Sequence, residues 1–522
     1  MAERIAQDSA DFRELRENGC VYVDKTDLLH TLVCDPTRKL YFISRPRRFG
    51  KSLMLSTLAC LFRGQRDLFK GLAIEKLDYD WAEYPILEFS FAGIKATSLA
   101  AFEVDFKTRL EESFAAAKAP WDPALSPGAN FRRAIRALAE AKGKPAVILI
   151  DEYDAPVGHA LADIPLATAI RGELADFYIQ IKECASDIRF MMMTGVTRFT
   201  QLSVFSALNN LNDLTMDGRN ATLLGYTDAE LDANFPKALH EHAQAMGLDY
   251  EAYRAQLRWW YNGYRFSPDN ETKVYNPFAI ARTLVARKGY FSGTWTRSGQ
   301  TSAVMNYFSV NQLAEMDYEN VRHVTEEDLD VCGLENIRPV AMLYQGGYLT
   351  IKDFRDPYFT LGIPDEEVRR AFNTLLVQKL VKSEDNAYRN ILCASLAEGD
   401  VATFLGRLSD LYAHLTYGPT ERSVQEFSYQ RILYVLLTSD GSFRVTAEDR
   451  QSQGRADLVA ETAERVFVFE LKVDGTAQEA LAQIRANGYA EPYRHGGKEV
   501  HLIGLAFDGR TRHLLDTATE PL

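Results

Sequence analysis

The chain has 522 residues, of which 46% are hydrophobic and 25% are charged, and its formal net charge is −13. A chain of this length and composition buries several hydrophobic cores, which excludes a disordered, collagen-like or coiled-coil protein. The acidic balance excludes a basic coat over the whole surface, but a local basic groove for phosphates remains compatible with it. The six cysteines form no CxxC pair, which argues against a zinc knuckle or a disulfide framework.

The sequence contains no segment typical of a membrane protein. No apolar run approaches the roughly 18–20 residues that span a bilayer. The N-terminal residues lack the apolar core of a signal peptide. We therefore expect no membrane contact, reduced thiols and a cytoplasmic protein.

The first two hundred residues alternate between short apolar runs and amphipathic runs. The apolar runs predict strands at 40–44, 86–93, 146–150 and 189–196. The amphipathic runs predict helices at 52–62, 131–143 and 174–186. Strands that are apolar on both faces are typical of a parallel sheet, so we expect an α/β domain with helices on both faces.

A phosphate-binding loop is predicted between the first strand and the first helix. Residues 44–52 read SRPRRFGKS, in which Gly50, Lys51 and Ser52 match the end of the P-loop pattern and Arg45 replaces its first glycine. The backbone N–H groups of such a loop face a phosphate at the helix N-terminus. Lys51 would reach the β- and γ-phosphates, and the Ser52 hydroxyl would bind Mg²⁺.

A second phosphate-site motif follows about a hundred residues later. In AVILIDEYD (146–154), Asp151 and Glu152 stand at the carboxyl end of an apolar strand, which is the form of a Walker B motif. Asp151 would hold Mg²⁺, and Glu152 would orient or deprotonate the attacking water. The alternative is a buried strand that ends in a solvated turn. The two motifs together favour binding and hydrolysis of ATP or GTP.

Several further residues near these motifs have two interpretations. Thr194, at the end of the strand at 189–196, can sense the γ-phosphate. Arg198 is either an arginine finger that acts on a second subunit or a helix-capping surface residue. Arg45, Arg47 and Arg48 either clamp phosphate or form ion pairs with acidic neighbours, and the residues leave both alternatives open.

The alternation of strand and helix patterns ends near residue 220. Residues 221–370 predict mostly helix, with a helix, a Gly-Gly turn and a strand at 339–354, and they carry no chemical motif. A long helix is predicted to open at 361–372. We expect three domains, at 1–220, 221–370 and 371–522.

A β-hairpin near the C-terminus carries a candidate metal site. Residues 453–473 predict two strands joined by ETAE, and alternation along the second strand places Glu470 and Lys472 on one face. The opposite face is predicted to pack the core; it carries Phe467, Phe469, Leu471 and Val473. Asp457 lies across the hairpin and can share the face of Glu470. Two converging carboxylates repel each other unless a divalent cation neutralises them, and a lysine beside them is typical of a metal-assisted hydrolase. The alternative is a surface hairpin with ordinary ion pairs.

Two predicted helices flank this hairpin. Glu426 stands in the first turn of the helix at 424–437 and can supply a third carboxylate. Gln483 lies on the helix at 477–489 and can reach the scissile bond.

The order Glu426, Asp457, Glu470-Leu471-Lys472, Gln483 resembles the PD-(D/E)xK nuclease superfamily. The earlier segments resemble the bacterial AAA-ATPase-like family, whose loop starts with arginine-proline and whose members often carry such a nuclease domain. The segments that carry this resemblance are YVDKT (22–26), RPRRFGKSL (45–53), LIDEYD (149–154), FSALNNLND (205–213), YNGYRF (261–266), VYNPF (274–278), YQGGYLTI (344–351) and LGIPDEEV (361–368). The proline that names the nuclease motif is replaced by Ala456, which is not a metal ligand position.

The resemblance implies a function for each site. Lys51 and Ser52 would bind nucleotide phosphate and Mg²⁺, with Asp151 and Glu152 as the Walker B pair. Asp457 and Glu470 would bind the catalytic Mg²⁺ or Mn²⁺, and Lys472 would act on the water. We expect an ATPase fused to a metal-dependent nuclease that acts on DNA, with RNA as the other candidate substrate. Nucleic acid would bind in a groove with the basic residues Arg444, Arg450, Arg455 and Arg485.

Two rival interpretations remain at this point. One is a nucleotide-dependent switch that binds nucleic acid without cutting it, in a mobile-element or phage-defence setting. The other is an interaction protein with a vestigial P-loop. Hydrolysis at subunit interfaces is common among P-loop ATPases, so a P-loop ATPase of this kind is compatible with a homo-oligomer, and the residues do not give the number of subunits.

Overall fold

The computed structural model describes residues 3–199, 210–286, 291, 293, 318–381, 387–414, 426–447 and 456–522, apart from residues 8, 332, 336 and 512. The chain divides into two compact units. Unit 1 holds the described residues up to Glu367, and unit 2 holds those from Val368 onward. The middle region therefore shares a unit with the N-terminal sheet, and the division into three domains stays a prediction.

The sheet of unit 1 is parallel, in the order β2-β3-β4-β1-β5. Its strands are β1 (Leu40–Ser44), β2 (Ile86–Ser90), β3 (Ala146–Asp151), β4 (Ile188–Gly195) and β5 (Asn212–Asp213). The central strands β1, β3 and β4 are almost wholly buried, whereas β2 at the edge alternates between buried and exposed residues. The apolar runs of the sequence are therefore confirmed as strands of a parallel sheet.

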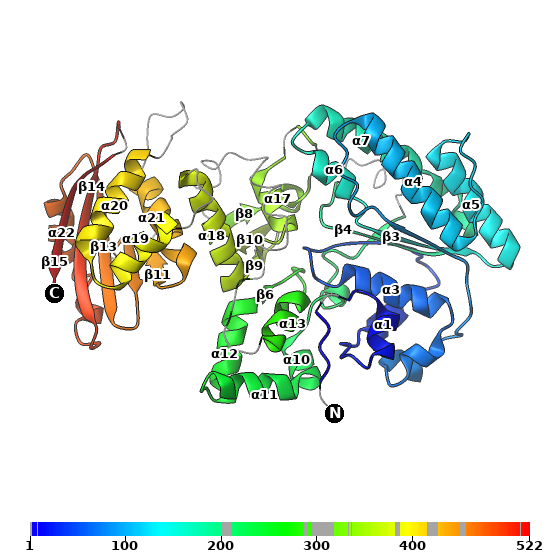
Figure 1. Cartoon of the computed structure of the whole chain (residues 1–522), viewed down its shortest axis with the longest axis horizontal. Coiled ribbons are helices and arrows are strands. Elements are labelled where there is room, and N and C mark those ends of the chain that lie inside the picture. The colour runs from blue at the N-terminus through cyan, green and yellow to red at the C-terminus, as the bar shows by residue number, and fades with distance from the viewer. Residues whose placement is uncertain are drawn as a thin grey trace. The chain divides into compact units, whose positions relative to one another are not determined.

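Helices cover both faces of this sheet. Figure 1 shows α4, α5 and α7 on one face and α1 and α3 on the other. The helices of this part are α1 (Phe12–Glu17), α2 (Thr26–Val33), α3 (Lys51–Phe62), α4 (Leu99–Ala117), α5 (Pro127–Lys142), α6 (Ala155–Ala160), α7 (Ile164–Tyr178) and α8 (Gln180–Glu183), with 3₁₀ turns η1 (Arg66–Phe69), η2 (Ala73–Lys76), η3 (Ala185–Asp187) and η4 (Gly218–Asn220). Because the chain leaves β1 for the far edge and returns through β3 to β4, the carboxyl ends of β1 and β4 form the switch point where ligands bind in such sheets.

The middle region is mostly helical and carries two small sheets. Its helices are α10 (Asp228–Asn234), α11 (Pro236–Ala245), α12 (Tyr250–Tyr261), α13 (Pro277–Val285), α16 (Glu326–Leu329) and α17 (Pro339–Gln345). Its strands are β6 (Asn262–Tyr264) and β7 (Val274–Tyr275), which pair with each other, and β8 (Val321–Val324), β10 (Tyr358–Gly362) and β9 (Thr350–Arg355), which form an antiparallel sheet in that order. The helix, turn and strand expected at 339–354 are confirmed as α17 and β9.

Unit 2 is a mixed sheet between helices. The sheet has the order β11-β12-β13-β14-β15, and only β13 and β14 run parallel. Its strands are β11 (Arg444–Ala447), β12 (Leu458–Glu461), β13 (Arg465–Val473), β14 (Glu499–Phe507) and β15 (Leu514–Pro521). Its helices are α18 (Glu366–Val381), which begins at the end of unit 1, α19 (Ala387–Ala397), α20 (Val401–His414), α21 (Glu426–Asp440) and α22 (Ala477–Ala486), with the turn η6 (Glu491–Tyr493).

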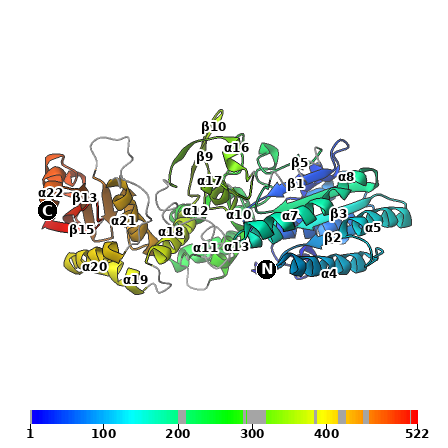
Figure 2. The same cartoon turned by 90° about the horizontal axis from the view of Figure 1, so that it is seen from above.

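Both faces of β13 are buried, so the face that carries Glu470 packs against other elements as well as the face expected in the core. Val466 and Val468 pack in a cluster with Leu481 of α22. On the other face, Phe469 contacts Phe404 of α20. Figure 2 shows α22 on one side of the sheet and α19 and α20 on the other. Glu470 therefore lies on a covered face, because α22 packs over the side that the alternation left open.

None of the helices in the described part of the chain is long and apolar enough to cross a membrane.

Candidate nucleotide and nuclease sites

The loop after β1 adopts the backbone of a phosphate-binding turn. Gly50 has φ +91° and forms the N-cap of α3, which begins at Lys51. Arg48 also has a positive φ, of +68°. Left-handed residues at these positions turn the chain sharply from strand into helix, so the N-terminus of α3 lies at the carboxyl end of the sheet.

The two nucleotide motifs meet at Asp151. The Ser52 hydroxyl donates to Oδ2 of Asp151 over 2.5 Å, and the Thr194 hydroxyl donates to Oδ1 of the same carboxylate. Ser52 is exposed and Asp151 is half-buried, whereas Thr194 is buried at the end of β4. A hydroxyl and a carboxylate are oxygen ligands that Mg²⁺ prefers, so this pair fits that ion.

Lys51 and Glu152 both lie in an environment of low polarity. The Lys51 ammonium is buried and donates to the carbonyl oxygens of Arg45 and Pro46, at 2.8 and 2.9 Å. Burial lowers the pKa of Lys51 to about 8, against the opposing charge of Asp151. Burial also raises the pKa of Glu152 above its usual value, and Asp151 adds to this effect. A phosphate group beside Lys51 would favour the charged form of this lysine and oppose the effect of burial.

These residues line one cavity of about 480 Å³. Its walls include Arg48, Gly50, Lys51, Ser52 and Glu152. The guanidinium of Arg48 stacks 3.9 Å from the ring centre of Phe278. Further walls include Val21, Tyr22, Val23 and Lys25, together with residues 223–226 and Phe278 of the middle region. The sequence analysis gave these segments no role in the cavity, although YVDKT (22–26) and VYNPF (274–278) are among those that carry the family resemblance.

The candidate metal site of unit 2 lies where β12 and β13 meet. Asp457 directly precedes β12, and its Oδ2 accepts a hydrogen bond of 2.7 Å from the backbone N–H of Leu471. The Lys472 ammonium lies 3.3 Å from Oε1 of Glu470. The structure therefore brings Asp457, Glu470 and Lys472 together, as the spacing predicts.

Glu470 is unusual among these residues, since it is only 2% exposed. Its Oε2 is buried and has no hydrogen-bond partner within the part of the chain that the structure describes. Burial raises the pKa of Glu470 to about 7, and the neighbouring charge of Asp457 adds to it. A buried acceptor without a donor, beside a second carboxylate, fits a divalent cation. No group of three or more metal-ligating side chains is gathered among the described residues.

The structure describes some of the helix residues around this metal site more fully than others. Glu426 begins α21, but its side chain lies outside the described residues. Gln430, one turn later, is buried and donates from Nε2 to the backbone carbonyl of Asp457. The sequence analysis missed Gln430, although its spacing of four from Glu426 places both on one helix face. Gln483 is half-buried on α22, and its role stays a prediction.

The basic residues expected in a groove are only partly described. Arg444 is exposed on β11, and Arg485 forms an ion pair with Glu520. Arg450 and Arg455 lie outside the described residues.

Comparisons with known proteins match both halves of the chain. A family described as a predicted AAA-ATPase matches residues 8–205, and the PD-(D/E)XK nuclease superfamily matches residues 424–517. An uncharacterized protein in the vnfD 5' region of Azotobacter chroococcum mcd 1 is 32% identical over 528 residues, which cover 98% of each chain. The chain belongs to the AAA-ATPase-like family and carries a PD-(D/E)XK nuclease-superfamily domain. Both resemblances drawn from the sequence are confirmed.

In this AAA-ATPase-like chain, Arg45 lies away from the nucleotide cavity, which corrects its assignment to phosphate. Its side chain is 1% exposed, and Nη1 donates to the carbonyl oxygens of Ser44 and Thr215, both at 2.8 Å. The guanidinium also stacks 4.1 Å from the ring centre of Phe266. Burial lowers the pKa of Arg45 to about 10. The turn after Ser44 directs the Arg45 side chain toward the middle region. Arg45 therefore stabilises the phosphate-binding loop through its own contacts with Ser44, Thr215 and Phe266.

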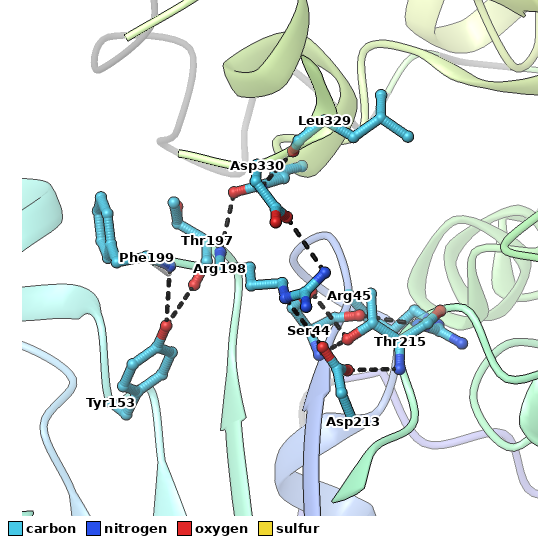
Figure 3. A network of polar contacts seen from close by, with 11 residues as sticks. Ser44, Arg45, Tyr153, Thr197, Arg198, Phe199, Asp213, Thr215, Leu329 and Asp330 are labelled. Atoms are coloured by element: carbon cyan, nitrogen blue, oxygen red, sulfur yellow. Dashed lines mark hydrogen bonds and ion pairs between the residues drawn. The ribbon is translucent and has the colours of Figure 1, made fainter. Parts of the chain in front are cut away.

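Arg198 does not line the nucleotide cavity of its own chain, and its assignment to nucleotide binding as a finger toward a second subunit stays a prediction. Its Nε lies 2.9 Å from Oδ2 of Asp213, and its Nη1 lies 3.1 Å from Oδ1 of Asp330 (Figure 3). Two aspartates within the same unit engage the guanidinium, so Arg198 is neither a surface cap nor directed at this cavity.

Proposed function

We propose that unit 1 binds and hydrolyses ATP with Mg²⁺, and that unit 2 hydrolyses phosphodiester bonds of nucleic acid with Mg²⁺ or Mn²⁺. The preferred substrate is DNA. The observation that carries the ATPase half is the contact of Ser52 with Asp151 at the cavity that Lys51 and Glu152 line. The observation that carries the nuclease half is the buried Oε2 of Glu470, which has no hydrogen-bond partner among the described residues, beside Asp457 and Lys472.

The residues of unit 1 divide the work of phosphoryl transfer to water. Lys51 and the backbone N–H groups after Gly50 would hold the phosphates. Ser52 and Asp151 would hold Mg²⁺, which neutralises charge on the phosphate oxygens. Glu152 would orient the attacking water and accept its proton at the carboxylate, and its raised pKa suits a general base. Thr194 would keep Asp151 oriented from β4.

The residues of unit 2 are suited to phosphodiester hydrolysis. Asp457 and Glu470 would hold a divalent cation, which supplies a Lewis acid for the phosphate oxygens. The Lys472 ammonium would orient the attacking water next to Glu470. Gln430 would fix the backbone of Asp457, and Glu426 and Gln483 would approach from the flanking helices.

The test is cleavage of end-labelled single- and double-stranded DNA and RNA in Mg²⁺ or Mn²⁺, with and without ATP. The Lys472→Ala protein serves as the inactive variant. The Lys498→Ala protein is the matched control, because Lys498 pairs with Glu461 away from the motif. We expect metal-dependent cleavage of DNA that is lost in Lys472→Ala and kept in Lys498→Ala.

Nucleotide binding is measured beside cleavage, with Lys51→Ala against Lys107→Ala, an exposed lysine of α4. Loss of Mg²⁺-dependent ATP binding in Lys51→Ala alone supports the ATPase half. ATP binding without cleavage of any substrate would contradict the nuclease half and favour a nucleotide-dependent binding switch.

A further inference from the structure

Arg198 joins three segments of unit 1 that are far apart in the sequence (Figure 3). It follows β4 by three residues, and β4 carries Thr194, the partner of Asp151. Its partners are Asp213 of β5 and Asp330 after α16. Neither the phosphate motifs nor the proposed chemistry uses Arg198, Asp213 or Asp330.

The first segment leads to the phosphate-binding loop. Asp213 lies on β5, beside Phe42 of β1. Its Oδ1 accepts a hydrogen bond of 2.8 Å from the N–H of Thr215. The Thr215 hydroxyl accepts one of 3.0 Å from the N–H of Ser44, the last residue before the loop. Arg198 is therefore two hydrogen-bonded residues away from the start of the P-loop.

The second segment is the turn of the Walker B motif. The hydroxyl of Tyr153 donates to the carbonyl of Thr197 over 2.9 Å and accepts from the N–H of Phe199 over 3.2 Å. The residues on both sides of Arg198 are thus bound to the residue after Glu152. Tyr153 is fully buried, so this attachment has little freedom to shift.

The third segment belongs to the middle region, outside the stretch that matches the ATPase family. Besides the ion pair with Asp330, the backbone N–H of Arg198 donates to Oε1 of Gln345 over 2.9 Å. The Gln345 amide in turn donates to the carbonyl of Leu329, next to Asp330, over 2.6 Å. Phe199 and Val331 add a backbone bridge between the same two segments.

The ion pairs of Arg198 with Asp213 and Asp330 are sensitive to a single substitution, because all three charged side chains are largely buried. The side chains of Arg198, Asp213 and Asp330 are 24%, 21% and 18% exposed, so each is largely withdrawn from water. Removing one partner of such a pair leaves the other charge buried and uncompensated. An exposed pair such as Arg133 and Asp122, whose side chains are 50% and 41% exposed, has no such effect.

We propose that Arg198 is a positioning residue for ATP hydrolysis. Arg198 holds the P-loop strand and the Walker B turn in register, and it does so only while it is bound to Asp330 of the middle region. This inference rests on the proposed ATPase function. The middle region would thereby be part of the hydrolysis machinery without touching the phosphates. Displacement of reacting groups by about 1 Å costs on the order of 100-fold in rate, so small shifts at this junction are enough.

The test compares Arg198→Gln, Asp330→Asn and the double variant with the wild-type full chain. We expect each single variant to lower kcat for ATP hydrolysis at least about 10-fold, with the Kd for ATP within about 2-fold of wild type. The double variant should be no slower than the slower single variant, because the two residues act through one contact. Arg198→Lys should recover part of the rate, since it keeps the charge but not both contacts. Arg133→Gln is the matched control, with kcat unchanged.

Three results would overturn the inference. One is an unchanged kcat in Arg198→Gln while the wild type hydrolyses ATP. Another is a double variant whose losses are the product of the single losses. The third is a parallel loss of kcat, ATP affinity and melting temperature, which marks a merely structural role. A wild type that binds no ATP or does not hydrolyse it overturns the proposed function first, and this inference with it.

Discussion

Glu470 of β13 is paired directly with Gly504 of β14 in the parallel ladder of unit 2. A Cβ atom on Gly504 would lie 2.2 Å from the carbonyl oxygen of Ala477, the first residue of α22. Gly504 therefore lets α22 approach the sheet closely beside the candidate metal ligand. The burial of Glu470, and with it the raised pKa of this carboxylate, depends on that approach.

We predict that Gly504→Ala lowers the free energy of unfolding of unit 2 by about 1–3 kcal/mol, because backbone atoms of α22 must move. It should also abolish most of the cleavage. The control is Gly406→Ala in α20, where a Cβ meets nothing within 4 Å. That change should stabilise the protein by about 0.5–1 kcal/mol. Chemical denaturation monitored by circular dichroism measures both, and equal stabilities would contradict the prediction.

Gln430 is the residue that we expect to matter without belonging to any motif. Its amide holds the backbone of Asp457, so Gln430→Ala should free that segment and lower the cleavage rate about 10-fold. Gln478→Ala, on the exposed side of α22, serves as the control. Single-turnover cleavage of labelled DNA measures the effect, and titration with Mn²⁺ shows whether metal affinity falls in parallel. Equal rates in Gln430→Ala and Gln478→Ala would contradict this assignment.

The pKa of Glu470 predicts how stability depends on pH. The folded value is about 7, and the ordinary value is 4.5. Between these values the folded state keeps a proton that the unfolded state releases, so the free energy of unfolding falls as pH rises through this window. Without divalent cations we expect a decrease on the order of 2 kcal/mol between pH 5 and pH 8.

Urea denaturation at several pH values measures this dependence. Glu470→Gln should lose this part of the pH dependence, because an amide does not titrate. Glu464→Gln, at an exposed position, should keep it. Added Mg²⁺ should raise stability most above pH 7, where the carboxylate is ionised. Identical pH profiles for wild type and Glu470→Gln would rule out Glu470 as the source.

Glu152 should separate nucleotide binding from hydrolysis. Glu152→Gln removes the general base and keeps the shape of the side chain, so we expect ATP hydrolysis to fall about 100-fold or more. The Kd for ATP should stay within a few-fold, because Lys51 and Ser52 are unchanged. Glu140→Gln, at an exposed position on α5, is the control. A steady-state phosphate-release assay beside equilibrium binding tests this, and a variant that hydrolyses ATP normally would exclude Glu152 as the base.

Much of the nucleotide site was predictable because its motifs are local. The sequence GKS at 50–52 and DE at 151–152 each follow a buried strand, and parallel strands bring their carboxyl ends to one edge of the sheet. The contact of Ser52 with Asp151 follows from this rule. The cavity walls at 223–226 and Phe278 were not predictable, since their place depends on how the middle region folds back.

The nuclease motif was likewise predictable in part from the sequence. The period of a strand was enough to place Glu470 and Lys472 on one face. It was not enough to show that α22 covers that face, because a helix can reach the sheet only where Gly504 leaves room.

The sequence by itself determined which motifs this protein carries: a phosphate-loop motif with a Walker B-like pair, and two carboxylates with a lysine on a hairpin. Residue type and spacing were sufficient for this, because each motif acts within a few residues of a strand end. Only the tertiary structure decided where the arginines act. Arg45 and Thr215 are 170 residues apart, and Arg198 and Asp330 are 132 apart. A charged side chain turns toward the nearest group that compensates its charge or accepts its hydrogen bonds, and that group is set by packing rather than by neighbours in the chain.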